Sequence, residues 1–472
     1  MPVSPLYRPD PRFMQLGPEF SDPVAPAGFP KTVLRRRNDR AAATVGLDTL
    51  TDEEWVRHFG RFEALPDNQP GPLAMRYHGH QFRSYNPDLG DGRGFLFAQL
   101  REAGSDRLLD LATKGTGRTP WSRNGDGRLT LKGGMREILA AGMLEALGVP
   151  TSRAFSLIET GEDLVRNDEP SPTRSAVLVR LSHSHIRFGT FQRQAYAENA
   201  ANIGRLVDHS IETYFPHLAD AEDRGTALLA EVVARTAKLA ARWMSAGFVH
   251  GVLNTDNMVV TGESFDYGPW RFLPHNDPNF TAAYFDSTGL YSFGRQPEAA
   301  FWNLQQLGGC LSLVSEQDAL VTALNGFAGA YRDNLLAAML GRLGVQRQGD
   351  EADVELVNAA FRALSAGGER LRWEPFFFDW FSGGEARALS GPRAELYAEA
   401  GFADFRARLA TFEADHPERL AHPYFAGAEP EEMLIDEVEA LWSAIDERDD
   451  WGPLHAKLDR IGAARVAWGL DR

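Results

Sequence analysis

The sequence predicts an α+β protein made of two lobes, the first rich in β-strands and the second mainly helical. Short apolar runs separated by turn residues extend to about residue 190, and long helical patterns follow from about residue 195. Hydrophobic residues make up 43% of the 472 positions, which is enough for a core in each lobe. We therefore expect an N-terminal lobe at residues 1–190 and a C-terminal lobe at residues 191–472.

The N-terminal lobe is predicted from four β-like runs and one helix. The runs GFLFAQL, LLDLATKG, AFSLIET and SAVLVRLS are separated by clusters of Gly, Asp, Asn and Pro, which is typical of strands joined by turns. A helix is expected in MREILAAGMLEALG, because Ile138, Leu139, Met143 and Leu147 recur at helical spacing. Gly148 ends that pattern and predicts the end of the helix.

The C-terminal lobe is predicted to be helical. The segment LLAEVVARTAKLAARWMSAG carries one broad apolar stripe and ends at Gly247, which is typical of a buried helix. The aromatic run RWEPFFFDWF is expected to pack between helices rather than to form an exposed docking surface. Further helices are expected at residues 298–315, 317–342, 352–366, 395–415, 430–446 and 453–468.

Composition and charge exclude several classes of partner and site. Lys and Arg total 49 against 65 Asp and Glu, so a nucleic acid or an anionic membrane would bind against a net charge of −16, and we expect neither. The N-terminus lacks a secretory or transit pattern, and we expect a cytoplasmic protein. Cys310 is the single cysteine, which excludes an intrachain disulfide and a cysteine-based metal site.

The candidate centre of the chemistry is HGVLNTDNMVVTGESFDYG, residues 250–268. Its alternation of polar and apolar runs predicts a loop, a strand, a tight turn, a second strand and a second loop. In such a hairpin Asp256 and Asn257 would lie beside Asp266. Their oxygens suit Mg²⁺ or Mn²⁺ held together with phosphates. The alternative is that NTDN contains ordinary turn residues bonded to the local backbone.

These residues occur in the order found in protein kinases. A kinase has a metal-binding Asn in a loop after a long helix, then a hairpin, then an Asp-Phe-Gly whose Asp binds metal. DYG at 266–268 differs from that triplet by one hydroxyl group. The first lobe supplies the Gly-rich turn LGDGRG, Lys114 at a strand end and Glu137 in a helix. Lys114 and Glu137 each have an ordinary alternative: the lysine could be a solvated surface charge, and the glutamate could simply complement the helix dipole. The order in which all these features occur nevertheless favours a two-lobed kinase-like fold with ATP between the lobes.

Two features complete the comparison with kinases. Arg180 and Arg187 flank the end of a β-like run and could grip a triphosphate, the alternative being a surface ion pair. The usual base position is vacant, because no Arg-Asp pair follows His250 and Asp256 stands immediately before Asn257. The sequence therefore departs from a kinase at the residue that would accept the proton.

The chain resembles the selenoprotein O family, also called the YdiU or SelO family, of kinase-fold protein adenylyltransferases. The resemblance is close over roughly residues 30–310 and looser beyond them. It rests on YHGHQF at 77–82, LGDGRG at 89–94, KGTGRTPWSRNGDGR at 114–128, MREILAAGMLEALGVPTSRA at 135–154, LVRLSHSHIRFGTF at 178–191, HGVLNTDNM at 250–258, DYGP at 266–269 and DPNF…QPEAAFWNL at 277–304.

The resemblance implies transfer of AMP from ATP to Ser, Thr or Tyr hydroxyls of proteins, with Mg²⁺ or Mn²⁺ and with the nucleotide flipped relative to kinases. It implies that Asp256 is the proton acceptor and that Asn257 and Asp266 hold the metal. The nucleotide-binding positions that it implies are Gly90, Gly92, Arg93, Lys114, Asp126, Gly127, Glu137, Arg180 and Arg187.

Two other functions are open on the sequence, a conventional kinase-type phosphotransferase and a non-catalytic nucleotide-binding pseudokinase. We expect a monomer that modifies other proteins, with the chain itself among the candidate acceptors. Many family members carry a cysteine or selenocysteine near the C-terminus, whereas this chain ends VAWGLDR. A C-terminal redox switch is therefore not expected here.

Overall fold

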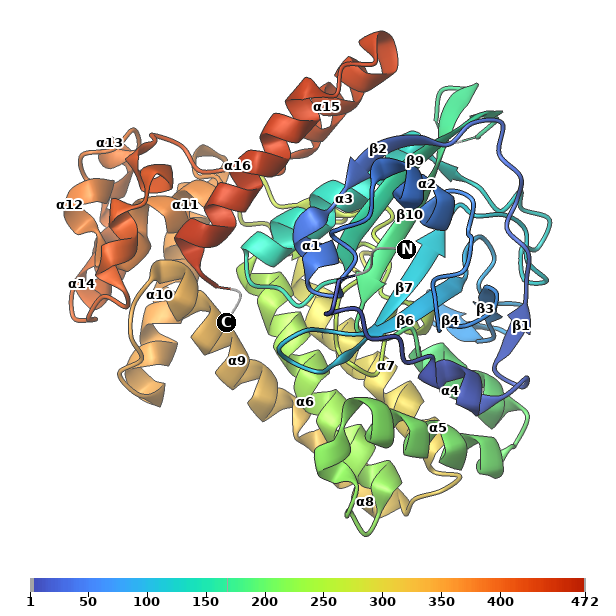
Figure 1. Ribbon diagram of the computed structural model, residues 1–472. Helices are drawn as coiled ribbons and strands as arrows, with labels where there is room; N and C mark the ends of the chain where they lie inside the picture. The colour runs from blue at the N-terminus through green and yellow to red at the C-terminus, as the bar shows by residue number, and fades with distance from the viewer. Residues whose placement is uncertain (1–3, 168, 471–472) are drawn as a thin grey trace.

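The computed structural model describes residues 4–167 and 169–470. Within them one sheet of eight strands dominates the N-terminal part, in the order β1-β3-β6-β7-β10-β9-β2, with β8 paired to β10 (Figure 1). The neighbouring strands are antiparallel. The strands are β1 Ser21–Pro23, β2 Val33–Arg37, β3 Leu73–Met75, β6 Leu96–Arg101, β7 Leu108–Lys114, β8 Leu129–Thr130, β9 Arg153–Leu164 and β10 Thr173–Ser182. The four predicted runs form β6, β7, β9 and β10, which confirms that part of the prediction.

Helix α3, Leu131–Ala146, packs against β9 and β10. It begins four residues before the predicted start, because the side chain of Thr130 accepts a hydrogen bond from the backbone N–H of Gly133. It ends as predicted, with Gly148 at φ 73°, a left-handed conformation that favours glycine. On its outer side α3 contacts α16, Gly452–Trp468, near the end of the chain.

The other face of the sheet is covered by short N-terminal helices. α1 spans Asp39–Ala43 and α2 spans Asp52–Phe59. In α2, Trp55 stacks on Phe155 of β9 with ring centroids 4.8 Å apart. A separate small hairpin, β4 Gly79–Gln81 with β5 Ser84–Asn86, leaves the sheet and approaches the helical part.

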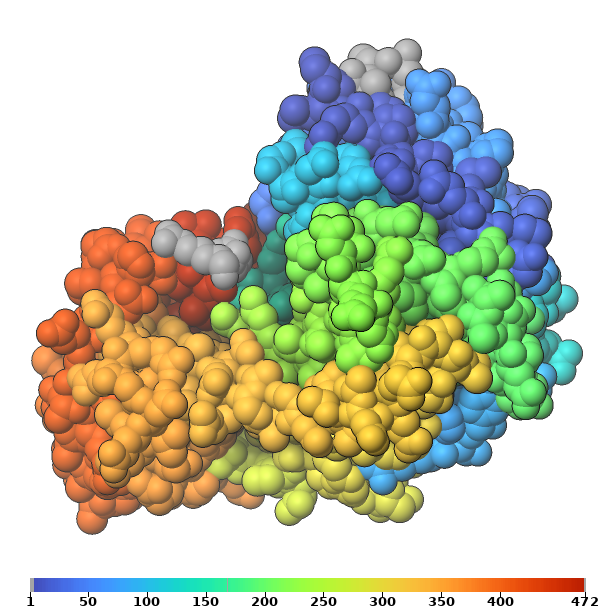
Figure 2. All heavy atoms as spheres, turned by 90° about the horizontal axis from the view of Figure 1, so that it is seen from below, coloured from blue at the N-terminus to red at the C-terminus, as the bar shows by residue number. Residues whose placement is uncertain are grey.

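The C-terminal half is mainly helical, as predicted. Helix α6 lies at the centre of a first group and contacts α5, α7, α8 and α9. A second group, α10 to α14, forms a bulge beside the rest of the molecule (Figure 2). The helices are α4 Phe188–Tyr196, α5 Ala200–Tyr214, α6 Arg224–Ser245, α7 Gln296–Leu311, α8 Gln317–Asn325, α9 Phe327–Leu343, α10 Asp350–Gly367, α11 Trp373–Trp380, α12 Glu385–Ala388, α13 Ala394–Tyr397, α14 Ala403–Leu409 and α15 Ile435–Arg448.

Two of the predicted helices are each broken in two. The segment 317–342 is interrupted at Gly326, where α8 ends and α9 begins. The segment 395–415 forms α13 and α14 with a 3₁₀ turn, Ala400–Phe402, between them. An apolar pattern predicts which face of a segment is buried, but it does not reveal a change of direction within the segment.

The hairpin predicted within residues 250–268 is not formed. The run 258–260 pairs instead with residues 186–188, through Phe188 N–H to Met258 O at 2.9 Å and Val260 N–H to Ile186 O at 3.1 Å. Ser264 pairs with residues 150–152 of the N-terminal part. Each run is buried, and each satisfies its backbone with a distant segment rather than with the other run. β11 Phe248–Val249 and β12 Arg271–Phe272 pair outside this region.

None of the helices in the described part of the chain combines the length and the hydropathy that crossing a bilayer requires.

A buried ion pair holds the aromatic core of the C-terminal bulge. Arg342 of α9 donates to Glu374 of α11 at 2.7 Å, and both side chains are almost fully buried. The Arg342 guanidinium also lies over the rings of Phe377 and Trp468, at 4.6 and 4.8 Å from their centroids. The aromatic run of α11 is therefore core, as predicted.

Replacing Glu374 with Ala is expected to lower the free energy of unfolding by about 3 kcal/mol, because Arg342 then keeps a buried charge without its partner. Urea unfolding followed by circular dichroism measures the change. The matched control is Glu399→Ala, which removes the exposed partner of Arg370 and should leave the unfolding midpoint nearly unchanged. Equal losses in the two variants would contradict the assignment.

Candidate active site

Three cationic side chains surround the carboxylate of Asp266. Lys114 Nζ lies 3.2 Å from Asp266 Oδ1, and Arg187 Nη1 donates to Oδ2 at 2.9 Å. Arg180 donates to Oδ1 at 2.5 Å. Lys114 ends β7 and Arg180 lies on β10, and the register pairs Arg180 with Ala112, two residues before Lys114. The two side chains therefore extend from the same face of the sheet.

Glu137 of α3 forms the second carboxylate of this centre. Its Oε1 accepts a hydrogen bond from Lys114, and its Oε2 lies 3.7 Å from Arg180 Nη1. The side chain is 3% exposed, so this pair is inside the protein and little screened by solvent. The predicted contact between strand lysine and helix glutamate is thus present.

The charge of Asp266 is fixed by its neighbours. Burial disfavours its ionised form, but Arg180, Lys114 and Arg187 together hold the pKa of Asp266 well below its usual value. Its backbone has φ 60°, in the left-handed region, where Asp is tolerated at some cost in energy. The carboxylate is therefore ionised at neutral pH.

Asp256 lies close to the same centre but has a different environment. Arg187 Nη1 donates to the backbone carbonyl of Asp256 at 2.6 Å, so one guanidinium binds both acidic segments. Asp256 Oδ1 is buried and has no hydrogen-bond partner among the described residues. Burial raises the pKa of Asp256 to about 6, although Arg187 opposes the shift. This carboxyl is free to accept a proton or a hydrogen bond from a ligand.

Asn257 is held by its own loop. Its amide nitrogen donates to Val252 O at 3.0 Å, and within the described residues its amide oxygen makes no hydrogen bond. Asn257 Oδ1 and the Asp266 carboxylate are hard oxygen donors of the kind that Mg²⁺ or Mn²⁺ prefers, with phosphate oxygens and water as further ligands. These two residues therefore fit the metal that the sequence implies.

Neighbouring residues that the sequence interpretation missed hold the loop of Asp256 in place. Thr255 donates to Gln192 Oε1 at 2.6 Å and accepts from the backbone of His80 in β4 at 2.7 Å. Asn254 Oδ1 accepts from Phe82 N–H and from the Tyr291 hydroxyl. The signal in the sequence was the polar run NTDN itself, whose first two side chains form these hydrogen bonds to other parts of the protein.

The Gly-rich turn packs against the loop that follows Lys114. A Cβ atom on Gly90 would lie 2.3 Å from the ring of Trp121, so no larger residue fits there. Arg93 accepts a hydrogen bond from Gly115 N–H at 2.6 Å through its carbonyl, and its side chain is exposed. Gly92 also lies against Trp121. These contacts place the turn beside the end of β7.

Asp91, in the same turn, was also missed. Its Oδ1 lies 3.5 Å from Arg187 Nη2, and its Oδ2 accepts from Met75 N–H at 3.0 Å. Asp91 therefore links the Gly-rich turn to the cluster around Asp266. The sequence feature that could have indicated this role is the position of Asp91 inside the Gly-rich motif LGDGRG.

Asp126 and Gly127 contact a different set of residues. Asp126 forms a two-pronged ion pair with Arg166 and accepts from Arg128 N–H at 2.9 Å. Gly127 has φ 72°, and a Cβ there would lie 2.2 Å from the backbone of Gly117. Asp126 lines a cavity of about 690 Å³ together with Arg118 and Arg128. None of these contacts joins Asp126 to the cluster that contains Lys114.

Comparison with known proteins gives consistent results along the chain. The family model described as Protein adenylyltransferase SelO matches residues 7–462. A protein from Synechococcus elongatus named Protein nucleotidyltransferase YdiU is 46% identical over 468 residues, covering 96% of this chain and 94% of the relative. A relative of the same name from Gloeobacter violaceus is 46% identical, covering 98% of this chain and 95% of the relative. Another from Azotobacter vinelandii is 37% identical, covering 96% of this chain and 92% of the relative.

Replacing Asp266 with Asn is expected to lower the free energy of unfolding of the metal-free protein by about 3 kcal/mol, because three buried cations lose their shared anion. Asp256→Asn is the matched control. It replaces a carboxyl group whose Oδ1 has no hydrogen-bond partner among the described residues by a neutral amide, so the free energy of unfolding should change little. Urea denaturation in the presence of a chelator measures both. A larger loss in Asp256→Asn than in Asp266→Asn would overturn this description of the cluster.

Proposed function

The chain belongs to the SelO family, and from this membership we propose that it is a protein adenylyltransferase that transfers AMP from ATP to Ser, Thr or Tyr hydroxyls of proteins. The observation that carries the proposal is the cluster in which Lys114, Arg180 and Arg187 surround Asp266. Beside it lies Asp256, whose Oδ1 has no hydrogen-bond partner among the described residues. Such a cluster provides cations for a triphosphate and a separate group for the proton.

We propose a two-lobed kinase-like architecture, with lobes at 1–190 and 191–472. The sheet with α3 would form the first lobe, and the helices around α6 the core of the second. The Lys114–Glu137 pair and the position of Asp266 between the two parts support this description. In this description ATP would bind between the lobes.

Metal and nucleotide would share the centre around Asp266. When bound, Mg²⁺ or Mn²⁺ would be held by Asn257 and Asp266 and would supply positive charge beside the phosphates. Lys114, Arg180 and Arg187 would then exchange contacts with Asp266 for contacts with phosphate oxygens. Glu137 would keep Lys114 in position. Further contacts to the nucleotide are proposed for Gly90, Gly92, Arg93, Asp126 and Gly127.

The reaction requires one proton transfer and one bond exchange at phosphorus. Asp256 would accept the proton of the acceptor hydroxyl, whose oxygen forms a bond to the α-phosphorus of ATP. The bond from the α-phosphorus to the bridging oxygen breaks, and pyrophosphate leaves with the bonding electrons. The cations of the cluster would stabilise the charge that develops on the leaving group. This sequence requires the α-phosphate, and not the γ-phosphate, to face Asp256.

A conventional phosphotransferase is the second candidate, because Lys114, Glu137 and Asp266 form a lysine–glutamate pair beside an aspartate, which is also the arrangement of a kinase. The two reactions differ in the phosphorus atom that is attacked. They can therefore be separated by the position of a radioactive label.

The purified protein is incubated with a mixed protein extract, Mn²⁺ or Mg²⁺, and ATP labelled at either the α- or the γ-phosphate. We expect protein-bound label from the α-position alone, with a mass increment of one AMP. Label from the γ-position would establish the kinase reaction instead. If ATP binds but neither label is transferred to protein, the non-catalytic alternative remains.

Asp256→Asn is expected to reduce the rate of label transfer by about 10²- to 10⁴-fold while the protein still binds ATP, because the proton acceptor is lost. Asp318→Asn, a change on the exposed surface of α8, is the matched control and should transfer label at the normal rate. A normal rate in Asp256→Asn would remove Asp256 from the mechanism.

A further inference from the structure

A cationic cavity lies between the sheet and α6, built from residues other than those of the cluster around Asp266. Its volume is about 340 Å³. Two of its lining residues are acidic, Glu145 and Glu263, in a protein whose net charge is −16. The cations that line it are Arg40, Arg107, Arg153, Arg235, Lys238 and Arg242.

Helix α6 contributes three of these cations from one face. Arg235, Lys238 and Arg242 are spaced by three and four residues and therefore point to the same side of the helix. Arg235 is paired with Glu231. Lys238 and Arg242 have neither an ion pair nor a side-chain hydrogen bond among the described residues. Lys238 is exposed and Arg242 is half-buried. Partial burial and the nearby Arg242 and Arg235 lower the pKa of Lys238, as expected where positive charges gather.

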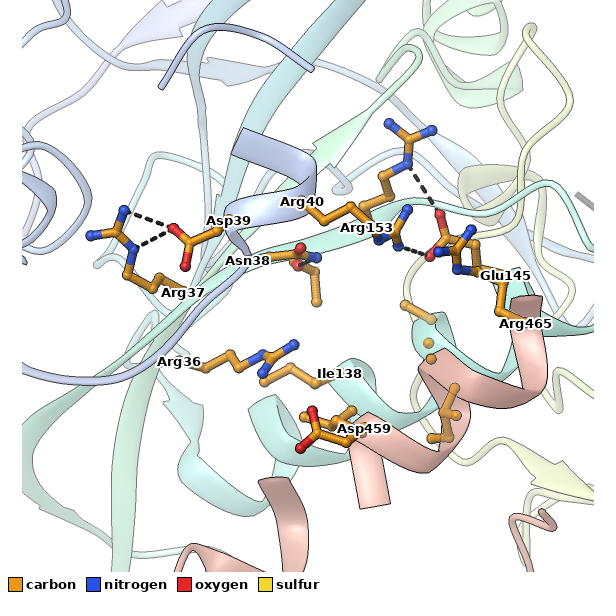
Figure 3. A pocket seen from close by; sticks show the side chains of 16 residues that line it. Arg36, Arg37, Asn38, Asp39, Arg40, Ile138, Glu145, Arg153, Asp459 and Arg465 are labelled. Atoms are coloured by element: carbon orange, nitrogen blue, oxygen red, sulfur yellow. Dashed lines mark hydrogen bonds and ion pairs between the residues drawn. The ribbon is translucent and has the colours of Figure 1, made fainter. Parts of the chain in front are cut away.

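The two acidic residues do not balance these positive charges. Glu145 is bound by Arg40 and Arg153, and Figure 3 shows both arginines reaching it from the wall of a neighbouring cavity of about 390 Å³. Glu263 is 8% exposed, and burial raises its pKa to about 7. Neither carboxylate is therefore a full counter-charge for the cations of α6.

Several buried polar atoms in the wall have no hydrogen bond of good geometry to any residue that the structure describes. They are Glu263 Oε2, Thr261 Oγ1 and His183 Nδ1. Burial and the nearby Arg107 and Arg153 lower the pKa of His183 to about 3, so the ring is neutral and adds no charge. Buried polar groups without partners indicate that a solvent molecule or a ligand completes them.

We propose that this cavity binds a small anion carrying at least two phosphate groups. Its volume lies within the range of small-molecule sites. Arg and Lys side chains are the groups that bind phosphate oxygens most strongly in proteins. Lys238 and Arg242, which form no ion pair with any described residue, are the side chains available to do so.

The cavity is connected to the candidate active site through the backbone. Pro150 and Thr151 line it, and Pro150 accepts a hydrogen bond from Ser264 N–H at 2.8 Å. Glu263, which also lines it, precedes Ser264, and Asp266 follows two residues later. An anion in the cavity would therefore contact both segments that position Asp266 relative to α3.

The test is the binding of inorganic pyrophosphate, measured by titration calorimetry in metal-free buffer without nucleotide. The variant Lys238→Gln/Arg242→Gln removes two charges from α6 and keeps good helix formers. We expect this variant to lose one binding event that wild type shows, or to weaken it by at least about tenfold. Circular dichroism verifies that α6 remains folded.

Arg332→Gln on α9 is the matched control, since Arg332 is an exposed helical arginine outside the cavity. It should bind pyrophosphate as wild type does. Identical titrations of wild type and the double variant would overturn the proposal, as would an equal loss in Arg332→Gln. Because no nucleotide or turnover is involved, this outcome is independent of whether the protein transfers AMP.

Discussion

The interaction on which the centre depends is the contact of one carboxylate, Asp266, with three cations from the sheet and from the segment that follows it. Lys114 and Arg180 come from adjacent strands, and Arg187 follows β10 at the start of the helical part. The backbone pairing of residues 186–188 with 258–260 brings Arg187 to Asp266. The sheet, the segment that follows it and the loop that contains Asp266 are therefore held together by charge at a single point.

Such a cluster is stable only while its charges are matched. Removing one partner from a buried ion pair costs several kcal/mol, because the remaining charge has lost both water and its counter-charge. Asp266 supplies the counter-charge even though its backbone lies in the left-handed region. A triphosphate and a divalent metal would bring both signs of charge at once, so they could replace these contacts without leaving any group unpaired. Asp256 has a raised pKa, and its Oδ1 has no hydrogen-bond partner among the described residues, so in the proposed reaction this carboxyl would accept the proton.

The sequence predicted the strands and helices that follow from a local pattern of apolar and polar residues. The strands β6, β7, β9 and β10 and helix α3 follow from periodicity, and their order led to the contact between Lys114 and Glu137. The prediction of a hairpin within residues 250–268 was wrong. Residues 258–260 and Ser264 pair with segments far away in the sequence, and no local pattern indicates such partners. The role of Asp91 beside Arg187 was missed for the same reason. The cations around Lys238 come from several separate segments, so no single motif could have revealed that cavity.

We propose that the cluster around Asp266 binds ATP with its α-phosphate facing Asp256. The decisive measurement is a crystal structure with a non-hydrolysable ATP analogue and Mn²⁺. We expect phosphate oxygens on Lys114, Arg180 and Arg187, the metal on Asn257 and Asp266, and the α-phosphorus nearest to the Asp256 carboxyl. A γ-phosphate facing Asp256, or a triphosphate bound away from these cations, would contradict it.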